Sequence, residues 1–271
     1  MPVIKRVSAD GVADDAVRDL WAGLKRHELW LKFAVHDIRQ RFRRSMLGPL
    51  WVTLSTGIMI AALGVIFGAL FEQPMQTFLP YVATGLIFWN FIVSTVSEGC
   101  LAFVAGEGFI RNVPMPLSAH FYRMFMRNLI VLALNLLIYV LVAVIFQMHL
   151  TLNHLLIIPG AVLFFINVGW VAFASAIVST RFRDIPQLIT SLLQVVFFAT
   201  PIFWTTAQLP TKLAFVDFNP IYHLIEIVRK PLLGGVPDPA SWLLTLATAV
   251  IGCLLVVLLY RRTYPRLAYW V

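Results

Sequence analysis

One stretch decides the fold of this chain: residues 39–72, which read RQRFRRSMLGPLWVTLSTGIMIAALGVIFGALFE. Its first six residues include four arginines, and after Arg44 the next charged residue is Glu72. An α-helix rises 1.5 Å per residue and the hydrocarbon core of a bilayer is about 30 Å thick, so about 20 apolar residues cross it. The stretch therefore predicts a membrane-spanning helix whose start is anchored by positive charge, with anionic headgroups contributing about 1 kcal/mol per nearby arginine.

The composition extends this conclusion to the whole chain. Of its 271 residues, 60% are hydrophobic and only 13% are charged, with a mean hydropathy of +0.84. Soluble domains carry about 25% charged residues. The net charge of +8 lies beside apolar runs, which is typical of membrane topology. We therefore expect membrane lipids, and no nucleic acid, as partners.

Six apolar runs are long enough to span. Because lipid offers the backbone no hydrogen-bond partner, all six should be helices, and the predicted fold class is an all-α membrane protein. A cytoplasmic N-terminal arm (1–49) would precede the six-span domain (50–260), and a short cytoplasmic tail (261–271) would follow it. The predicted spans are 50–71, 79–105, 128–147, 155–179, 186–205 and 241–260.

Lysine and arginine give the orientation. If the N-terminus is cytoplasmic, the inner segments 1–49, 106–127, 180–185 and 261–271 hold 18 of the 21 cationic residues. Cytoplasmic loops carry an excess of such residues. The sequence thus predicts a multi-pass protein with both termini in the cytoplasm.

Two segments outside the spans have helical periodicity. Residues 15–44 predict an amphipathic helix, interrupted near 27–30, that lies at the membrane surface with Trp21 and Trp30 at the interface; a helix that binds a soluble partner is the alternative. Residues 219–233 begin with Asn219 as N-cap and Pro220 in the first turn, and Glu226 and Lys230 form an i,i+4 pair. This second segment is too short to span, so we expect a re-entrant or interfacial helix at the outer side, with an ordinary surface helix as the alternative.

A pair of glycines and a set of aromatic residues each allow two interpretations. Gly64 and Gly68 are four residues apart, a spacing that lets two helices approach closely, although such pairs also occur by chance. Aromatic residues gather in the second and fifth spans and could stack on sugars in a channel, whereas contact with lipid is the simpler interpretation for any one of them. The aromatic candidates are Phe88, Trp89, Phe91, Phe197, Phe198, Phe203 and Trp204.

Catalytic and nucleotide-binding motifs are missing from the sequence. It contains no GxxxxGK[ST], HExxH or GxSxG motif, and Cys100 and Cys253 are expected to be free thiols. Glu98 is the one acidic residue within a predicted span, and a structural hydrogen bond or a helix-end role is favoured over ion coupling. We expect no catalytic residue, metal or cofactor here, and the energy for any transport would come from another protein.

Several motifs together resemble the membrane subunits of ABC-2 type polysaccharide exporters, the O-antigen, capsule and teichoic acid group. These motifs are FRRSMLGPLW (42–51), FIRNVPMPLS (109–118), TRFRDIPQLITSLLQVVFFATPIFW (180–204), NPIYHLIEIVRKPLLGG (219–235) and RRTYPRLAYWV (261–271). The resemblance covers residues 40–271 in order. Residues 1–14 have no counterpart in the pattern, and the segment FFATPIFW departs from it because many relatives carry serine before the proline.

The resemblance implies a half-transporter of the bacterial inner membrane. Two copies would form the pore, and a separate cytoplasmic ABC ATPase dimer would bind ATP and magnesium and drive a lipid-linked polysaccharide outward. Arg39, Arg41, Arg43 and Arg44 would meet the substrate phosphates, because arginine suits bidentate phosphate binding.

The resemblance also implies roles for three loops. ATPase coupling would involve Glu107, Phe109, Ile110, Arg111, Pro114 and Pro116, with a plain connecting loop as the alternative. The inner loop motif would be Arg181, Arg183 and Asp184. The outer gate would consist of Asn219, Pro220, Glu226 and Arg229, with Lys212 nearby.

Two other functions remain open. One is an ABC-2 permease for a teichoic-type polymer, a drug, haem or a lipid. The other is an ATP-independent channel or a membrane-embedded enzyme, which the missing catalytic motifs argue against.

Overall fold

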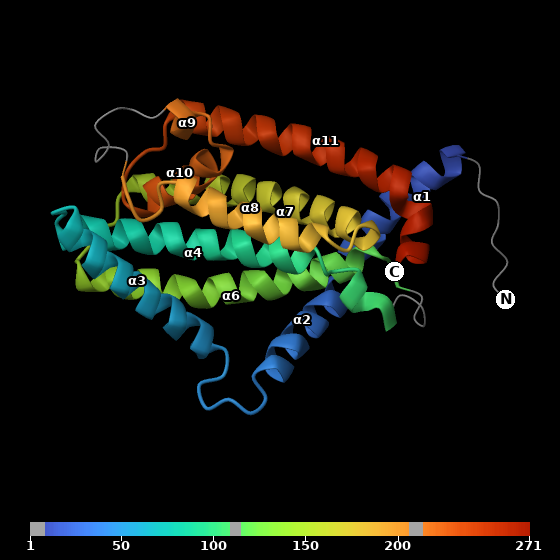
Figure 1. Ribbon diagram of the computed structural model, residues 1–271, viewed down its shortest axis with the longest axis horizontal. Helices are drawn as coiled ribbons and strands as arrows, with labels where there is room; N and C mark the ends of the chain where they lie inside the picture. Colours follow the sequence, from blue (N-terminus) through green and yellow to red (C-terminus); the bar gives the residue numbers. More distant parts are fainter. Residues whose placement is uncertain (1–8, 109–114, 206–213) are drawn as a thin grey trace.

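The computed structural model describes residues 9–108, 115–205 and 214–271, and every regular element among these is a helix (Figure 1). The elements are α1 (Ala9–Lys25), α2 (His27–Arg41), α3 (Leu50–Leu70), α4 (Met75–Gly99), η1 (Val104–Gly106), α6 (Ser118–Ile145), η2 (Leu152–Leu156), α7 (Ile157–Arg181), α8 (Ile185–Ala199), α9 (Ala214–Asp217), α10 (Pro220–Leu232) and α11 (Pro239–Trp270).

Five helices of the described residues are long and apolar enough to cross a membrane: α3, α4, α6, η2 with α7, and α11. They coincide with five of the predicted spans and confirm that these runs are helical, with shifted ends. The helix α6 begins ten residues before the predicted span, because its first turns are polar and were not part of the apolar run. The helix α11 continues through the predicted tail as far as Trp270.

The predicted fifth span was wrong in length. The helix α8 has 15 residues and ends at Ala199, so it is about 22 Å long. A proline disfavours the helical conformation of the residue before it. Thr200, which precedes Pro201, is accordingly extended, with φ −107° and ψ 132°. Residues 200–205 continue as an irregular segment beside α10 rather than as the last turns of a span.

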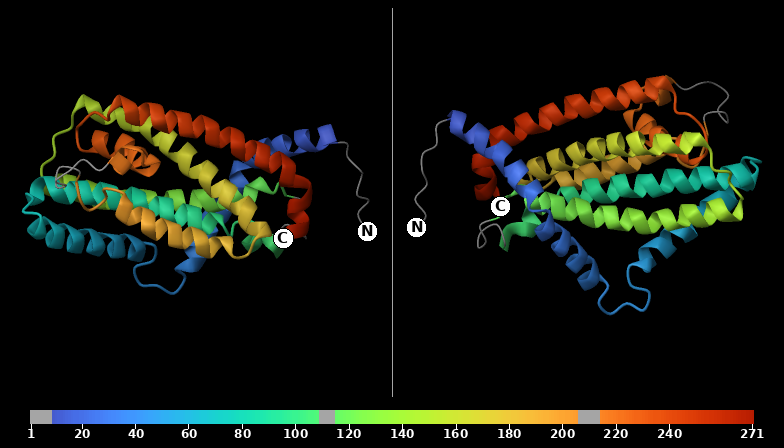
Figure 2. Two further views of the ribbon diagram at one scale, coloured as in Figure 1. Left: turned by 45° about the horizontal axis from the view of Figure 1, so that its top comes forward. Right: turned by 180° about the vertical axis from the view of Figure 1, so that it is seen from behind.

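The helices form an elongated bundle with two distinct ends (Figures 1 and 2). We call the end that carries α1, the start of α6 and the end of α11 the basic end. We call the opposite end, where α9 and α10 lie, the α10 end. The helix α4 lies at the centre of the bundle and packs on α3, α6, α7, α8 and α10, which makes it the most buried of the five long helices.

The N-terminal arm is interrupted as predicted, with α1 ending at Lys25 and α2 beginning at His27. Both helices pack on the start of α6, and α1 also packs on α11. Trp30 contacts protein rather than facing outward: its indole N–H donates to the Gly23 carbonyl at 3.1 Å, and its ring lies 6.0 Å from that of Tyr122. Trp21, by contrast, is 60% exposed and stays available for the membrane surface.

The small-residue face of α3 packs on α4, which decides between the two interpretations of the glycine pair. Gly64 and Gly68 are buried, and a Cβ at Gly64 would lie 2.2 Å from the Leu79 Cδ1 atom of α4. Cys100 and Cys253 are free, as predicted.

Candidate functional site

An apolar cavity of about 510 Å³ lies between α3, α4 and α8. Four of the predicted channel aromatics line it: Trp89, Phe197, Phe198 and Phe203. Ring centroids lie 5.5 Å apart for Trp89 and Phe197, and 5.3 Å apart for Phe197 and Phe203. We call this space the aromatic cavity.

Phe67 of α3 also lines the aromatic cavity, 5.0 Å from Phe203. Phe67 was not among the aromatic residues predicted to line a channel, although it stands directly before Gly68 of the small-residue face. Polar lining is sparse and comes from Asn90, Thr190 and Gln194. Such a surface suits the apolar faces of sugar rings or a hydrocarbon chain, and it offers few hydrogen bonds to hold a ligand in place.

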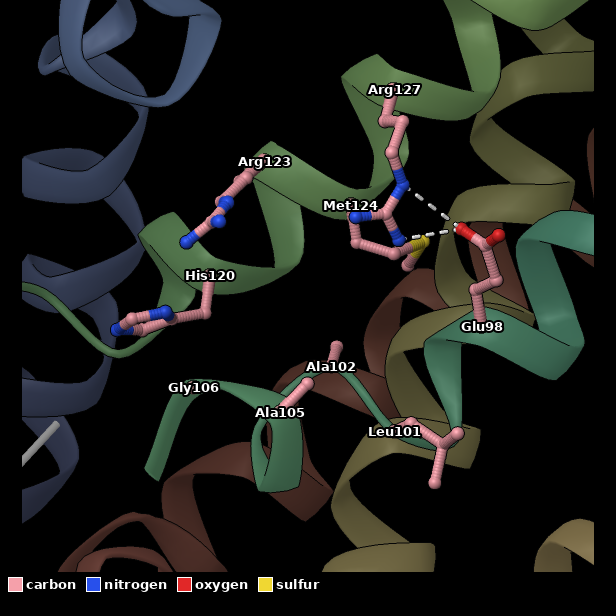
Figure 3. Close-up of a pocket in the computed structure, with 9 residues that line it drawn as sticks. All are labelled: Glu98, Leu101, Ala102, Ala105, Gly106, His120, Arg123, Met124 and Arg127. Carbon is pink, nitrogen blue, oxygen red and sulfur yellow. Dashed lines mark hydrogen bonds and ion pairs between the residues drawn. The ribbon is translucent and has the colours of Figure 1, made fainter. Parts of the chain in front are cut away.

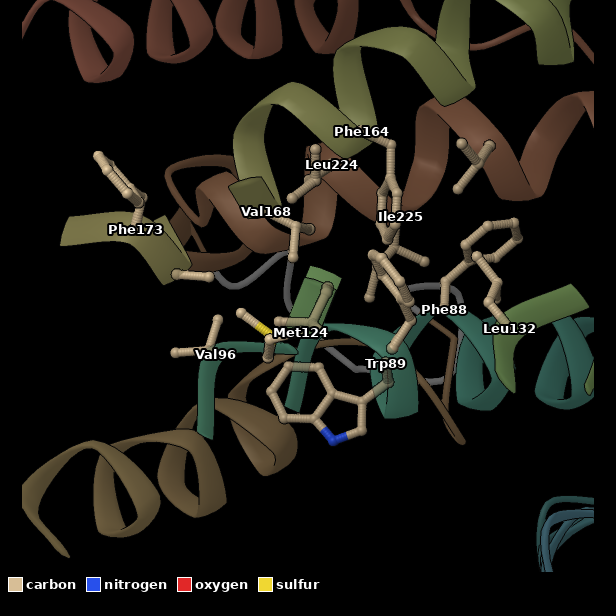
Figure 4. Packing of buried hydrophobic residues seen from close by; sticks show 14 of the residues in the cluster. Phe88, Trp89, Val96, Met124, Leu132, Phe164, Val168, Phe173, Leu224 and Ile225 are labelled. Atoms are coloured by element: carbon tan, nitrogen blue, oxygen red, sulfur yellow. The ribbon is translucent and has the colours of Figure 1, made fainter. Parts of the chain in front are cut away.

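Phe88 and Phe91 lie elsewhere, in the core of the bundle. Each is 3% exposed, and both contact Phe164 of α7, at 5.1 and 5.8 Å between ring centroids. Figure 4 shows the Trp89 ring on the other side of α4 from Phe164. Within one chain, Phe88 and Phe91 therefore pack against α7 and do not line the aromatic cavity, whereas their neighbour Trp89 does. Trp204 is half-buried, and its carbonyl accepts the Tyr81 hydroxyl at 3.1 Å.

Charged side chains form a network at the basic end, as the favoured interpretation of Glu98 predicted. Its carboxylate accepts from Arg127 Nη2 at 2.6 Å and from Asn128 Nδ2 at 2.9 Å. Asp37 of α2 accepts from Arg123 Nε at 2.7 Å and from Arg127 Nη1 at 3.2 Å. We call these five residues the Asp37–Glu98 network, and it joins α2, α4 and α6.

A second cavity, of about 230 Å³, opens beside this network (Figure 3). Glu98 and η1 form one side of it, and His120, Arg123 and Arg127 of α6 form the other. A Cβ at Gly106 would lie 2.7 Å from His120 Nδ1, so glycine is what lets η1 approach α6. The two arginines are already engaged by carboxylates, and the network must rearrange before they can bind an anion.

The four predicted entrance arginines lie on the last turn of α2 and the residues after it, and all four are exposed. Arg41 reaches Glu98 at 3.5 Å and lines a groove with Asp37, Gln40 and Arg127. This groove brings Arg41 near Arg127, which the sequence analysis did not select. Phosphate binding by the four arginines stays a prediction.

A fully buried charged group lies at the α10 end. Arg229 is 1% exposed; its Nε donates to Glu226 at 2.7 Å and its Nη1 donates to the Pro201 carbonyl at 2.7 Å. Its guanidinium stacks 3.9 Å from the centre of the Tyr81 ring, and Tyr81 donates its hydroxyl to the Pro201 carbonyl at 3.0 Å. We call Tyr81, Pro201, Glu226 and Arg229 the Arg229 cluster.

Electrostatics keep the Arg229 cluster charged. Burial by itself lowers the pKa of the Arg229 guanidinium, but the Glu226 carboxylate, together with the Tyr81 and Tyr222 hydroxyls, outweighs burial and holds that pKa above its usual value. Lys230 reaches the other Glu226 oxygen at 3.4 Å, which confirms the predicted i,i+4 pair. The cluster ties α10 and α4 to the segment that follows α8.

Asn219 and Pro220 begin α10 as predicted. The Asn219 side chain accepts from the backbone N–H of Ile221 at 2.9 Å, and its amide donates to the Thr200 hydroxyl at 3.0 Å. Asn219 therefore caps α10 and binds the end of α8 at the same time. Lys212 lies outside the described residues.

The inner loop motif lies where α7 meets α8, on the surface. The Arg181 guanidinium lies 5.1 Å from the Trp270 ring of α11, within the range of a cation–π contact. Arg183 and Asp184 are exposed, and Asp184 precedes the first residue of α8. The functional role of this motif stays a prediction.

The predicted coupling residues are described only in part. Glu107 and Pro116 are half-buried, whereas Phe109, Ile110, Arg111 and Pro114 lie outside the described residues.

Close to that segment the structure reveals Asp19, which sequence reasoning missed. Its carboxylate accepts from the backbone N–H groups of Leu117 and Ser118, each at 2.9 Å, and from the Tyr260 hydroxyl at 2.8 Å. One aspartate among several on an amphipathic helix carries no signal of such a role, because its partners come from two distant segments.

Comparisons with known proteins place this geometry in context. A family model described as ABC-2 type transporter matches residues 31–233. An O-antigen export system permease protein RfbA of Klebsiella pneumoniae is 25% identical over 210 residues, which cover 73% of this chain and 78% of the relative. The polysialic acid transport protein KpsM of Escherichia coli is 25% identical over 207 residues, with coverage of 74% and 80%. An RfbA of Myxococcus xanthus is 22% identical over 201 residues, with coverage of 73% and 77%.

Proposed function

This chain belongs to the ABC-2 type transporter family, and from that premise we propose that it is the membrane subunit of an ATP-driven polysaccharide exporter. The relatives are named for O-antigen export and polysialic acid transport, and the substrate class follows from them. The observation that carries the proposal is the aromatic cavity between α3, α4 and α8. Aromatic faces guide sugar rings without binding each one tightly, which a long polymer needs in order to move.

In this proposal, the chain crosses the bacterial inner membrane six times, with α8 and the segment 200–205 together as the fifth crossing. The basic end faces the cytoplasm, since the N-terminal arm, the start of α6 and the end of α11 bring most of the cationic residues there. The amphipathic arm lies at the inner surface, where Trp21 and the arginines meet lipid headgroups. The α10 end faces outward.

The chain works as a homodimer in this proposal. One face of α8 is apolar and exposed, with Leu188, Leu192, Val195 and Phe198 between 53% and 68% accessible. In a membrane, either lipid or a second copy covers this face. A second copy facing it would place two aromatic cavities around one shared conduit.

A separate cytoplasmic ABC ATPase supplies the energy in this proposal. It docks on residues 106–118, and Arg39, Arg41, Arg43 and Arg44 receive the phosphates of the lipid-linked glycan. ATP and magnesium bind to the ATPase, because this chain has no P-loop motif.

Deletion of the gene in its source organism tests the proposal. We expect surface polysaccharide to disappear while lipid-linked polymer accumulates inside the cell, and the wild-type gene should restore export. Unchanged surface polysaccharide would refute the proposed substrate class.

The nearly apolar lining of the aromatic cavity favours one alternative, an ABC-2 permease for a lipid or a hydrophobic drug. In that case, the purified complex would hydrolyse ATP faster on addition of the lipid or drug and would not respond to lipid-linked glycan.

A further inference from the structure

We infer that Asp19 is a positioning residue that makes the N-terminal arm, the start of α6 and the end of α11 move as one body. The inference rests on the proposed function, in which the segment directly before α6 receives the movement of the ATPase. It assigns to one carboxylate the transfer of that movement to two further parts of the molecule.

The first contact is a helix cap supplied from a distance. The first N–H groups of a helix have no partner within the helix, and the N-cap side chain usually accepts one of them. Here the N-cap residue of α6 is Leu117, which has no acceptor. Asp19 takes over this role from α1, almost 100 residues earlier, with one oxygen on the N–H of Leu117 and the other on the N–H of Ser118. Its negative charge also suits the positive end of the helix dipole.

The contact between α1 and α6 is close as well as polar. The Ser118 hydroxyl donates to the Asp19 carbonyl at 2.8 Å, so side chain and backbone of Asp19 both bind the same turn. A Cβ at Gly23, one turn later on α1, would lie 2.2 Å from Ser118 Oγ. Only glycine at this position lets the two helices meet in this way.

The same carboxylate also binds α11. The Tyr260 hydroxyl donates to Asp19 Oδ2 at 2.8 Å, and the Tyr264 hydroxyl donates to Oδ1 at 3.4 Å. Tyr260 is fully buried and Asp19 is 7% exposed, so water does not compete for these bonds. Each carboxylate oxygen thus joins a backbone N–H of α6 to a phenol of α11.

This arrangement makes a mechanical joint rather than three separate contacts. A shift of the first turn of α6 displaces Asp19, and Asp19 draws α1 and Tyr260 with it. The Trp30 indole of α2 donates to the Gly23 carbonyl of α1, so α2 is tied to α1. Movement that enters at residues 106–118 is therefore passed to α2, where the four exposed arginines begin.

The test compares two variants with a matched control in the purified permease–ATPase complex, reconstituted in vesicles. Asp19→Asn keeps the shape but presents an amide N–H₂ to one of the two backbone donors. Tyr260→Phe removes the shorter of the two bonds between Asp19 and α11 and leaves the bonds to α6 in place. Asp15→Asn removes the same charge from an exposed ion pair one turn earlier on α1, with Arg18. The probe is lipid-linked glycan extracted from the source cells and labelled with tritium, and the readout is glycan exported per ATP hydrolysed.

We expect Asp19→Asn to lower this ratio about tenfold and Tyr260→Phe to lower it about threefold, while Asp15→Asn leaves it unchanged. Loss of folded protein alone would lower export and ATP hydrolysis together and leave the ratio unaltered. An unchanged ratio in Asp19→Asn would overturn the inference. If Asp19→Asn fails to assemble, Tyr260→Phe decides, and an unchanged ratio there overturns it equally.

The result for the wild-type complex distinguishes a failure of this inference from a failure of the proposed function. If the wild-type complex hydrolyses ATP without moving the glycan, the proposed substrate is wrong. If the wild type exports and all variants match it, only the role of Asp19 is wrong.

Discussion

The two ends of the bundle use the same chemistry in opposite settings. At the α10 end, Arg229 and Glu226 are buried, with 1% and 4% of their surfaces exposed. At the basic end, the side chains of Asp37, Arg123 and Arg127 remain 12%, 23% and 24% exposed, and Glu98 is 29% exposed. A buried ion pair cannot exchange partners without leaving a bare charge in an apolar medium, whereas a half-buried pair can exchange them through water. The Arg229 cluster is therefore suited to hold α10 in place, and the Asp37–Glu98 network is suited to rearrange.

The largest effect should come from breaking the Arg229 cluster on one side. Arg229→Leu leaves the buried Glu226 with only the partly exposed Lys230 as its partner, and we expect about 3–5 kcal/mol of destabilisation. The measurement is the midpoint of thermal unfolding in detergent. Replacing both partners, Glu226→Leu with Arg229→Leu, should recover part of the loss, because no uncompensated charge remains.

Lys230→Leu is the matched control for that experiment, since its side chain is 39% exposed and it pairs with the same carboxylate. We expect it to cost less than about 1 kcal/mol. Equal losses in Arg229→Leu and Lys230→Leu would mean that burial does not set the difference between the two ends.

A smaller effect should come from replacing glycines at close helix contacts, namely Gly160 between α7 and α10 and Gly64 between α3 and α4. In Gly160→Ala, the new Cβ would lie 2.4 Å from the Ile227 carbonyl of α10, which cannot rotate away. We expect about 1–3 kcal/mol of destabilisation from overpacking, measured by the same unfolding midpoint. Gly64→Ala meets the flexible end of the Leu79 side chain at 2.2 Å and should cost less. The reverse order would show that α3 is held more rigidly than α10.

Breaking the network at the basic end should have a weaker and salt-dependent effect. Asp37→Asn removes one carboxylate from Arg123 and Arg127, which still have access to water, and we expect a cost of about 1 kcal/mol at low salt. Because salt screens exposed charges, the cost should shrink at 1 M sodium chloride, while that of Arg229→Leu should not. Unfolding midpoints at two salt concentrations check this, and identical salt dependence of the two variants would remove the distinction.

The smallest effect on stability should come from the aromatic cavity. Phe198 is 67% exposed, so Phe198→Ala should change the unfolding midpoint little and still reduce glycan export. Phe88→Ala is the control, because it empties a packed site in the core and should cost about 3–5 kcal/mol. Normal export in Phe198→Ala, measured as surface polysaccharide in complemented cells, would argue against a channel role for this ring.

Much of the fold follows from local rules that the sequence states directly. A 21-residue apolar run after four arginines must become a helix in lipid, and α3 covers Leu50–Leu70 almost as predicted. The start of α10 also follows from local chemistry, because Asn219 and Pro220 act on their own helix. Thr200 and Pro201 carried the signal for the end of α8. The apolar run continues past them, however, and the predicted span was therefore extended to residue 205.

The tertiary structure alone decided which side chains meet. Hydrophobic periodicity does not distinguish Phe88, which packs against α7, from Trp89, which turns toward α8. Nor does any local pattern join Asp19 to Leu117 and Tyr260, or Arg229 to Tyr81. A backbone helix is specified by hydrogen bonds four residues apart, so sequence suffices for it. A buried carboxylate or guanidinium is satisfied by whatever donors the packed helices bring to it, and that depends on the assembly of the whole bundle.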